Sequence, residues 1–186
     1  FATVAITSPG RRMQFDALGR PTSLAVDTET GAQTTTTQYL SGFKTRVTNP
    51  RGKVTTQGMW AQDDPAKAQL ATITAPEKVN VVIARNVLGN PTSIRRYSGT
   101  GASYAVDVTR SYVYDSGQRL CKTLEPEVVA TAQGYDAAGN VAWRAPGINI
   151  TGSSCVAESS VPAGRKISYH YDAVNQLTTV SYGDGS

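Results

Sequence analysis

A short phrase returns six times along this chain of 186 residues: an aromatic residue and an aspartate, then a turn, then an alternating run. Its common form is Tyr-Asp-x-x-Gly-x-x-x. The copies are QFDALGRPTSL (14–24), FKTRVTNPRGKVTTQ (43–57), ARNVLGNPTSI (84–94), YDSGQRLCKTL (114–124), YDAAGNVAWRA (135–145) and YDAVNQLTTVSY (171–182). Recurrence of one such unit is typical of a repeat architecture, and it constrains the fold more than any single residue does.

The spacing of the copies follows from the turn residue of each one. These turn residues are Gly19, Gly52, Gly89, Gly117, Gly139 and Asn175, so the steps between copies are 33, 37, 28, 22 and 36 residues. A strict solenoid would keep one period. The variable steps therefore predict a constant hairpin core, with loops or an extra strand pair between copies.

Each copy predicts a strand, a turn and a second strand. The aspartates can hydrogen-bond the backbone two residues on, and the turn glycine can supply a positive φ without a Cβ clash. The run after the turn alternates β-branched and aromatic residues, which suit a pleated surface. The units are therefore predicted to be β-hairpins, with the tyrosines stacked from hairpin to hairpin. The residues carrying this prediction, besides the turn residues, are Asp16, Tyr114, Asp115, Tyr135, Asp136, Tyr171 and Asp172.

Tandem Tyr-Asp-x-x-Gly copies resemble the YD repeats of bacterial RHS proteins and of the related teneurins. The stretch SYVYDSGQRLCKTLEPE (111–127), followed by YDAAGNVAWRA, is most similar to RHS proteins of Gram-negative bacteria. There a QRLC segment and an EPE segment precede a Tyr-Asp-Ala-x-Gly-Asn copy. The resemblance covers nearly the whole chain. Copies two and three depart from it, because Lys44 and Asn86 replace the aspartate and Arg85 replaces the tyrosine.

The resemblance implies an all-β fold, in which consecutive antiparallel hairpins form a curved or spiralling extended sheet, part of a cocoon-like shell. It implies that residues 1–186 are a single repeat region of about six degenerate copies from a longer protein. The implied function is non-catalytic: a wall that encloses and protects a C-terminal toxin cargo. Such a toxin is exported by a dedicated secretion system, commonly type VI, or belongs to an insecticidal toxin complex.

The expected partners follow from that role. They are the remaining repeats of the parent chain, the enclosed cargo and proteins of the secretion apparatus. The chain opens without methionine on a strand-like stretch (2–6), which agrees with a piece of a longer protein that is secreted or at the bacterial surface. Open sheet edges could also pair copies of the piece with one another.

A second hypothesis is a cell-surface adhesive or carbohydrate-binding module. Exposed tyrosines and Trp143 could stack on the faces of sugar rings. The two hypotheses differ in where the aromatic side chains point.

Composition agrees with an extended sheet exposed on both faces. Hydrophobic residues make up 39% and charged residues 17%, and 17 glycines and 9 prolines are spread along the chain. The net charge of +4 includes no basic run, so nucleic-acid binding is not predicted. No stretch approaches the ~20 apolar residues of a membrane span, and the first ten residues lack the pattern of a secretory signal.

Two cysteines and one histidine are the remaining chemical candidates. Cys121 and Cys155 either form one disulfide or stay separate thiols, with Cys121 a small buried strand residue. Tetrahedral zinc needs about four ligands at motif spacing, so no metal and no cofactor are predicted. His170 and Asp172 are not placed near a nucleophile, so no enzyme is predicted.

The stretch 61–73 is polar and is predicted to be a short helix or a loop. It contains Asp63-Asp64-Pro65, a superficial likeness to the Asp-Pro-x-Gly motif with which RHS proteins release their C-terminal segment. Lys67 stands where the glycine would be. No self-cleavage centre is therefore predicted there.

Overall fold

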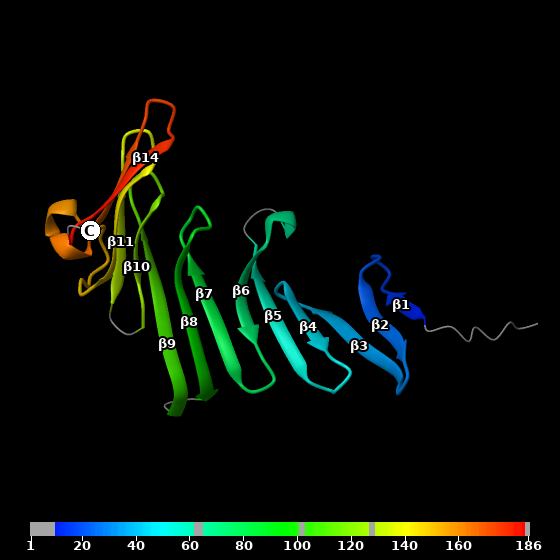
Figure 1. The fold of residues 1–186 in the computed structure, drawn as a ribbon. Helices are drawn as coiled ribbons and strands as arrows, with labels where there is room; N and C mark the ends of the chain where they lie inside the picture. The colour runs from blue at the N-terminus through cyan, green and yellow to red at the C-terminus, as the bar shows by residue number, and fades with distance from the viewer. Residues whose placement is uncertain (1–9, 62–64, 101–102, 127–128, 185–186) are drawn as a thin grey trace, which may run out of the picture. The chain divides into compact units, whose positions relative to one another are not determined.

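The computed structural model describes residues 10–61, 65–100, 103–126 and 129–184. The strand expected over 2–6 and the pair Asp63-Asp64 lie outside these ranges. Within them, fourteen strands follow one another as neighbours in one open sheet, β1 to β14 in chain order, as Figure 1 shows. The all-β fold built of consecutive antiparallel hairpins is confirmed. The curvature of the sheet stays a prediction.

The strands are β1 (Arg11–Phe15), β2 (Pro21–Thr28), β3 (Gly31–Leu40), β4 (Lys44–Thr48), β5 (Val54–Trp60), β6 (Gln69–Thr74), β7 (Val79–Arg85), β8 (Pro91–Thr100), β9 (Ser103–Tyr114), β10 (Leu120–Leu124), β11 (Ala130–Tyr135), β12 (Val141–Ile148), β13 (Ile167–Tyr171) and β14 (Leu177–Tyr182). Three short 3₁₀ helices lie within the described ranges: η1 (Pro65–Lys67), η2 (Glu158–Ser160) and η3 (Ala163–Arg165). The stretch 61–73 thus holds both a short helical turn and the start of a strand. No helix in the described part of the chain is long and apolar enough to cross a membrane.

The uneven steps between copies have a structural cause. Between the turn of the first copy, which joins β1 to β2, and that of the third, which joins β7 to β8, lie the hairpins β3–β4 and β5–β6. From β7 onward each hairpin carries its own copy. The long step before Asn175 comes from the segment between β12 and β13, which holds η2 and η3. Extra strand pairs and an extra loop therefore both separate the copies, as the spacing predicts.

By its contacts the chain divides into two compact units. The first unit comprises Phe1–Val82 and Arg96–Val106, and the second comprises Ile83–Arg95 and Asp107–Ser186. In the described part of the first unit only Gly58 is fully buried. The threonine-rich strand β3 alternates exposed and half-buried positions along its second half. β-Branched threonines suit such a pleated surface, which keeps contact with water on its faces.

The second unit has a hydrophobic core. It consists of Ala130, Ala132, Trp143, Ala145, Ile148 and Val161. The pairing of β11 with β12 sets Ala130 opposite Ile148, and Ala132 opposite Ala145, so these side chains share one face of the sheet. Trp143 lies opposite Gly134, where a Cβ atom would collide with the indole ring.

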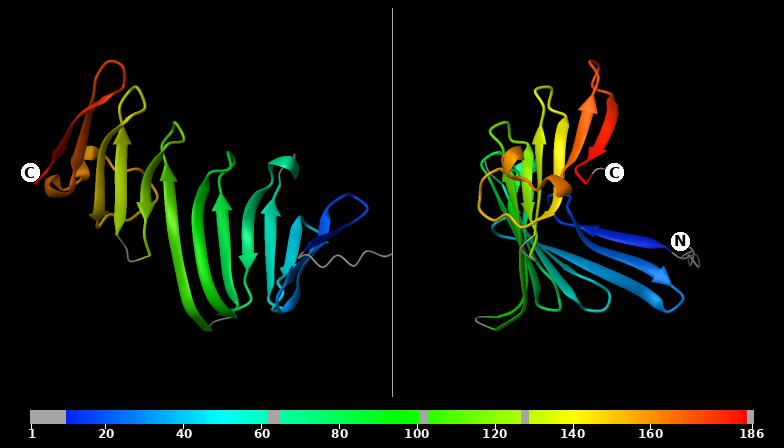
Figure 2. Two further views of the ribbon diagram at one scale, coloured as in Figure 1. Left: turned by 45° about the vertical axis from the view of Figure 1, so that its right-hand side comes forward. Right: turned by 60° about the vertical axis from the view of Figure 1, so that its left-hand side comes forward.

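Residues 149–166, between β12 and β13, are called the cover segment here, because they supply Val161 to this core and pack Ile150 and Val156 against it. Figure 2 shows this segment beside the strands of the second unit. The two units therefore differ in kind. In its described residues the first unit is a sheet with almost no buried side chains, whereas the second has a sheet face closed by a segment without strands.

Candidate functional site

Within the described residues, six hairpin turns share one hydrogen-bond pattern. An Asp or Asn begins each turn, and its Oδ1 accepts from the backbone N–H four residues later at 2.8–3.0 Å. The fourth residue of each turn donates its N–H to the carbonyl of the first at 2.9–3.1 Å. This is the pattern of a three-residue hairpin loop whose last residue is left-handed. The first residues are Asp16, Asn49, Asn86, Asp115, Asp136 and Asp172.

The fourth residue of every one of these turns has a positive φ, between 62° and 91°. Glycine occupies this position in four turns, at Gly19, Gly52, Gly89 and Gly139, and Asn175 occupies it in the last. A residue with a Cβ is disfavoured there, which explains the glycine of the repeated phrase. The side-chain oxygen of the first residue fixes the loop from the other end.

The register expected for the second copy is wrong. Lys44 does not replace the aspartate: it is the first residue of β4 and pairs with Gly58. Asn49 fills the aspartate position instead, because an amide oxygen can accept the two backbone N–H groups and a lysine side chain cannot. The turn from Asn49 joins β4 to β5, so in the antiparallel first unit it lies at the sheet end opposite to the turn from Asp16. In the third copy, Asn86 does fill the aspartate position.

The fourth copy also departs from its expected geometry. Gly117 lies in the turn, but the positive φ of 62° belongs to Gln118, three residues after Asp115. The left-handed residue is therefore the one three positions after the aspartate, whether or not it is a glycine. A left-handed glutamine costs about 1–2 kcal/mol. The Oε1 atom of Gln118 accepts from Asn86 Nδ2 at 3.0 Å and from Asn90 Nδ2 at 3.4 Å, which ties this turn to the turn of the preceding copy.

The tyrosines link successive hairpins through their hydroxyl groups. Tyr114 donates to the carbonyl of Pro91 at 2.9 Å, and Tyr135 to the carbonyl of Leu120 at 2.8 Å. Tyr171 donates to the carbonyl of Val141 at 3.1 Å. Each acceptor is the first strand residue after the preceding turn, five residues beyond its Asp or Asn. The Tyr-Asp pair thus combines a bond to the previous hairpin with the start of the next turn.

A hydroxyl bond of this kind also occurs in the described part of the first unit. Tyr39, in β3, donates to the carbonyl of Pro21 at 3.1 Å, although no aspartate follows this tyrosine. Tyr39, Tyr114, Tyr135 and Tyr171 are all half-buried. Burial, and then the neighbouring Tyr112, raise the pKa of Tyr114, so its hydroxyl keeps the proton that it donates. The link between copies is therefore a hydrogen bond to the backbone.

Two turns add an arginine at their fifth residue. Arg20 pairs with Asp16 at 2.7 Å, and its guanidinium carbon lies 4.1 Å from the centre of the Tyr39 ring. Arg119 pairs with Asp115 at 2.8 Å and lies 4.5 Å from the centre of the Tyr135 ring. Each arginine therefore bridges its own turn to the tyrosine of the following hairpin, by charge and by a cation–π contact.

These contacts lower the pKa of the turn carboxyl groups. The side-chain hydrogen bond from Arg20, with the backbone N–H of the same residue, lowers the pKa of Asp16. For Asp115 the backbone N–H of Arg119 is the larger cause, and its side chain adds to it. At Asp136 burial opposes ionisation, but hydrogen bonds from Asn140 and from the backbone N–H groups of Ala138 and Gly139 together outweigh it, so this pKa also falls below its usual value.

The last two turns are joined by asparagines. Asn140 Nδ2 donates to Asp136 Oδ2 at 3.1 Å within its own turn and to Asn175 Oδ1 at 2.9 Å in the next. Together with the bonds of Gln118 and the contact of Arg119 with Tyr135, this forms a row of contacts from turn to turn in the second unit.

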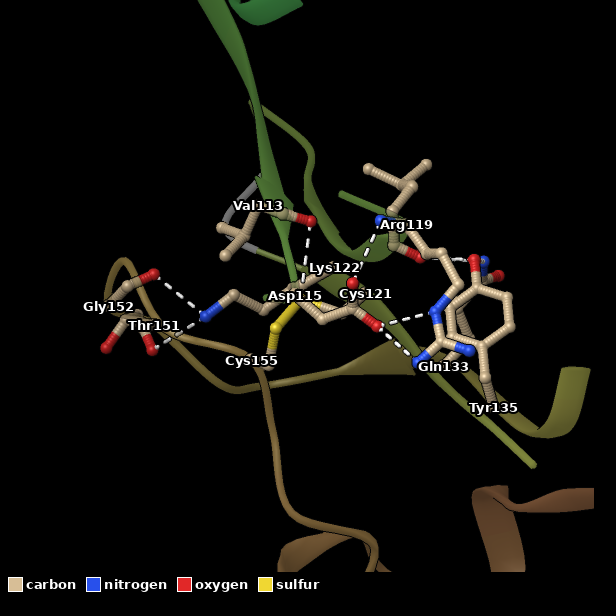
Figure 3. Close-up of a disulfide and its surroundings, with 11 residues drawn as sticks. Val113, Asp115, Arg119, Cys121, Lys122, Gln133, Tyr135, Thr151, Gly152 and Cys155 are labelled. Carbon is tan, nitrogen blue, oxygen red and sulfur yellow. Dashed lines mark hydrogen bonds and ion pairs between the residues drawn. A yellow bond between two sulfur atoms is a disulfide. The ribbon is translucent and has the colours of Figure 1, made fainter. Parts of the chain in front are cut away.

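Cys121 and Cys155 are bonded to each other in the structure, with their Cα atoms 5.5 Å apart. Cys121 is an extra residue in β10, because Leu120 pairs with Tyr114 and Lys122 already pairs with Val113. In such a bulge, two successive residues face one partner residue. Both Cys121 and Lys122 reach the cover segment, as Figure 3 shows.

Lys122 is the largest polar side chain among the buried residues, 1% exposed. Its ammonium group donates to the carbonyl of Gly152 at 2.8 Å and to that of Thr151 at 3.5 Å. Burial lowers the pKa of this ammonium group, because a charge is harder to hold away from water. Sequence reasoning missed Lys122. The neighbouring Cys121 is a signal that could have indicated its burial, since a disulfide from Cys121 requires a second segment to lie over this part of β10.

The residues weighed for catalysis have other surroundings. His170 is exposed in β13 and pairs with Thr179 of β14. Asp172 starts a turn, and its Oδ1 accepts from the N–H groups of Val174 and Gln176. Cys121 is bonded to Cys155 and is not a thiol. No group of three metal-binding side chains occurs in the described part of the chain.

No family model matches the sequence, and no curated protein matches it. Solved structures do match. One is the Photorhabdus luminescens Tc holotoxin pore with a mutation in TccC3: 16% of residues are identical, 97% of this chain is covered, and the TM-score is 0.60. A second is the crystal structure of TcdB2-TccC3-TEV, with 15% identity over 97% of this chain and a TM-score of 0.59.

This chain spans 9% of the length of each of these two chains. At such low identity the likeness is one of fold. The run of antiparallel hairpins described above therefore occurs as a segment of much longer chains in Tc toxin assemblies. This agrees with the all-β fold of consecutive antiparallel hairpins that the sequence predicts.

Proposed function

We propose that this chain is a non-catalytic wall segment of an RHS-type toxin, one part of a shell that encloses and protects a toxin cargo at the C-terminal end of the parent protein. The observation that carries the proposal is the repeated junction between hairpins. The same tyrosine bond and the same Asp or Asn turn recur along the chain. Similarity to segments of Tc toxin chains supports it.

The junction suits a wall because each hairpin is fixed to the previous one by contacts encoded in the repeat itself. Strand pairing alone leaves the register of a two-sided polar sheet weakly specified. The bond from Tyr135 to the Leu120 carbonyl requires one alignment of β11 with the preceding hairpin. A long sheet can then be extended hairpin by hairpin with little hydrophobic core.

The faces of the sheet also suit an enclosing role. In the first unit the strands present threonines and charged pairs, such as Arg12 with Asp27 at 2.7 Å. In the second unit, Leu120, Thr131, Gln133 and Arg144 are among the residues that line a shallow groove of about 120 Å³. Apolar side chains on the strands, such as Val26, Val82 and Val108, are exposed as well, so these faces offer a cargo both polar and apolar contacts.

The proposal extends to partners and location. The partners are further repeats of the same parent chain, the cargo, and proteins of a secretion apparatus such as a type VI system. Residues 1–186 then form one repeat region of the parent. The parent is secreted or displayed at the bacterial surface and acts on competing cells.

The surroundings of the aromatic residues favour a wall over a sugar-binding surface. Stacking on a sugar ring needs an exposed aromatic face. Trp143 is 6% exposed in the core of the second unit, and Arg119 covers a face of Tyr135. The hydroxyls of Tyr114 and Tyr171 are bound to backbone carbonyls.

Limited proteolysis of the full-length parent protein tests the proposal. The cargo is expected to survive protease until the repeat region is cut, whereas the same cargo expressed alone is digested at once. A variant with Tyr135→Phe and Tyr171→Phe should expose the cargo sooner, and Tyr182→Phe should not, since Tyr182 is 50% exposed at β14. Digestion of the cargo at equal rates inside the parent and alone would show that the chain is no enclosing wall.

A further inference from the structure

The cover segment is attached to the sheet at a few points. Val161 enters the core, the carbonyls of Thr151 and Gly152 accept from Lys122, and Cys155 is bonded to Cys121. Its two helical pieces, η2 and η3, have three residues each. Apart from the peptide bonds that join its ends to β12 and β13, the bridge is the single covalent attachment of this segment to the strands, since the described residues contain no other cysteine.

The two ends of the bridge differ in exposure. Cys121 is 3% exposed, whereas Cys155 lies in an exposed stretch of the cover segment. A thiolate breaks a disulfide by attacking one sulfur atom, and access decides which one. The Sγ atom of Cys155 is therefore the one that a thiol from solution can reach, and the Sγ atom of Cys121 is the leaving group.

The leaving sulfur has a cation beside it in the chain. The bulge in β10 directs Cys121 and Lys122 toward the same five residues of the cover segment, 151–155 (Figure 3). The bonds of the buried Lys122 ammonium go to two neutral carbonyls. A positive charge on the adjacent residue favours the thiolate form of Cys121, and a more stable thiolate leaves faster. Once this sulfur is protonated, its S–H can donate to the carbonyl of Val113, which lies 3.3 Å from Sγ.

We propose that the Cys121–Cys155 bridge is a thiol-exchange site, which small thiols of the glutathione class reduce, and that its reduction releases the cover segment from the sheet. The thiolate of the reductant attacks Cys155 Sγ and forms a mixed disulfide with it. The bond between the cysteines breaks, its electron pair goes to Cys121 Sγ, and that sulfur then takes a proton from water. A second thiol attacks the sulfur of the reductant in the mixed disulfide, which frees Cys155 and oxidises the two thiols to a disulfide.

Release is expected to be local. The backbone pairings among β11, β12, β13 and β14 involve neither cysteine of the bridge. Without it, the cover segment keeps its carbonyl bonds, including that of Lys166 with the N–H of Gly183 at 2.8 Å, and the contacts of its apolar side chains, while the core residues of β12 lose part of their cover. The inference does not depend on the proposed wall, because it concerns the chemistry of the second unit alone.

Mapping of the mixed disulfide tests the site of attack. The chain is treated with reduced glutathione at neutral pH, quenched in acid, digested, and analysed by mass spectrometry. Glutathione is expected on Cys155. Glutathione on Cys121, or a bridge that stays intact in excess glutathione while the strands remain folded, would overturn the proposal.

Hydrogen exchange tests the release. On reduction by dithiothreitol, the amides of 150–161 are expected to exchange about tenfold faster or more, while those of β11, β13 and β14 keep their protection. A Cys155→Ser variant should show the same pattern without reductant. Unchanged exchange in the cover segment would contradict the proposal, and so would loss of protection in all strands together, which would make the bridge a global staple.

A lysine variant tests the part played by Lys122. With Lys122→Met the mixed disulfide is expected to form about threefold more slowly, because the leaving thiolate loses the neighbouring positive charge. If Lys122 served only to hold the cover segment, its removal would loosen the segment and the bridge would react faster. That result would refute a role of Lys122 in the exchange reaction. Lys53→Met, which removes an exposed charge in the first unit, is the matched control and should leave the rate unchanged.

Discussion

The two units of the chain use the same turns but hold their sheets in different ways. In the first unit, the described strands have a single fully buried residue, Gly58, and side-chain bonds such as that of Tyr39 add to the strand pairing. In the second unit, five apolar residues of β11 and β12 form a core with Val161 of the cover segment, and a disulfide attaches this segment to β10. The repeated phrase therefore specifies the hairpins. The core depends on a departure from the repeat, because the long connection after β12 covers one face of the sheet.

This difference shows which effects should dominate stability. Burial of apolar area is the largest favourable contribution to folding, and in the described residues the apolar core is confined to the second unit. Turn geometry and hydroxyl bonds act locally and should contribute equally in both units. Four predictions compare the units on this basis, from the largest effect to the smallest.

The largest effect is expected from Trp143→Ala, which empties the core beneath the cover segment. Loss of a buried aromatic side chain should lower the free energy of unfolding by about 3–5 kcal/mol. The half-buried Trp60 in β5 is the matched residue of the first unit, and Trp60→Ala should cost about 1–2 kcal/mol. Urea unfolding followed by circular dichroism measures both. Equal losses would mean that the two units do not differ in the way described.

The second prediction concerns the left-handed turn position. Gly139→Val should destabilise its hairpin by about 1–3 kcal/mol, because a β-branched residue is strained at a φ of 91°. Gly19→Val in the first unit should cost a similar amount, since its φ is 74° and a Cβ there meets no atom within 4 Å.

The control for these two variants is Gly164→Ala, where a Cβ also meets nothing within 4 Å and the φ is not positive. Its melting temperature should stay close to that of the parent chain. An unchanged melting temperature for Gly139→Val would refute the turn assignment. A loss in one unit only would show that the turn energy depends on the packing around it.

The third prediction concerns the hydroxyl bonds between hairpins. Tyr135→Phe removes a donor and leaves the Leu120 carbonyl with one bond fewer, at a cost of about 0.5–1.5 kcal/mol. Tyr39→Phe should cost a similar amount in the first unit, and Tyr182→Phe, at a 50% exposed position, almost nothing. Thermal unfolding measures all three. If Tyr182→Phe cost as much as Tyr135→Phe, the hydroxyl bond would not be the link between hairpins.

The smallest effect is expected from the charges of three turn aspartates and of Asp107 in β9. The pKa values of Asp16, Asp107, Asp115 and Asp136 are lowered in the folded chain, and for Asp107 the hydrogen bond from Arg95 is the main cause. A carboxyl group with a lowered folded pKa stabilises the fold above its unfolded pKa of about 3.9, and this stabilisation is lost as the pH falls through the folded pKa. The melting temperature should therefore be flat from pH 7 to 5 and fall below about pH 4.

Asp115→Asn isolates this charge effect from the turn itself. Asparagine keeps the side-chain oxygen that accepts from the backbone, as Asn49 and Asn86 do, but it cannot ionise or pair with Arg119. The variant should be slightly less stable at pH 7 and should lose less stability on acidification. A large loss at pH 7 would show that the ion pair, and not the amide or carboxyl oxygen, holds the turn.

Much of the fold could be predicted from the sequence, because turns and strands are decided by local chemistry. The side-chain oxygen of Asp136 and the left-handed freedom of Gly139 act within five residues, so the pattern Asp-x-x-Gly specifies a hairpin wherever it occurs. The alternation of the strands and the lack of a long apolar stretch determined the all-β fold in the same way. Where the pattern weakens, local rules still hold, but the wrong residue is easily chosen, as with Lys44 for Asn49 and Gly117 for Gln118.

The tertiary structure alone decided which carbonyl each tyrosine binds, where the arginines lie and what covers the second unit. These contacts join residues that are distant in the sequence, such as Tyr171 with Val141 or Lys122 with Gly152, and no local propensity specifies them. The sequence by itself determined that this chain is a run of antiparallel hairpins. The packing of one hairpin on the next decided which side chains became links between hairpins. The packing of the cover segment on β10 to β12 decided which side chains became core and which cysteines formed the bridge.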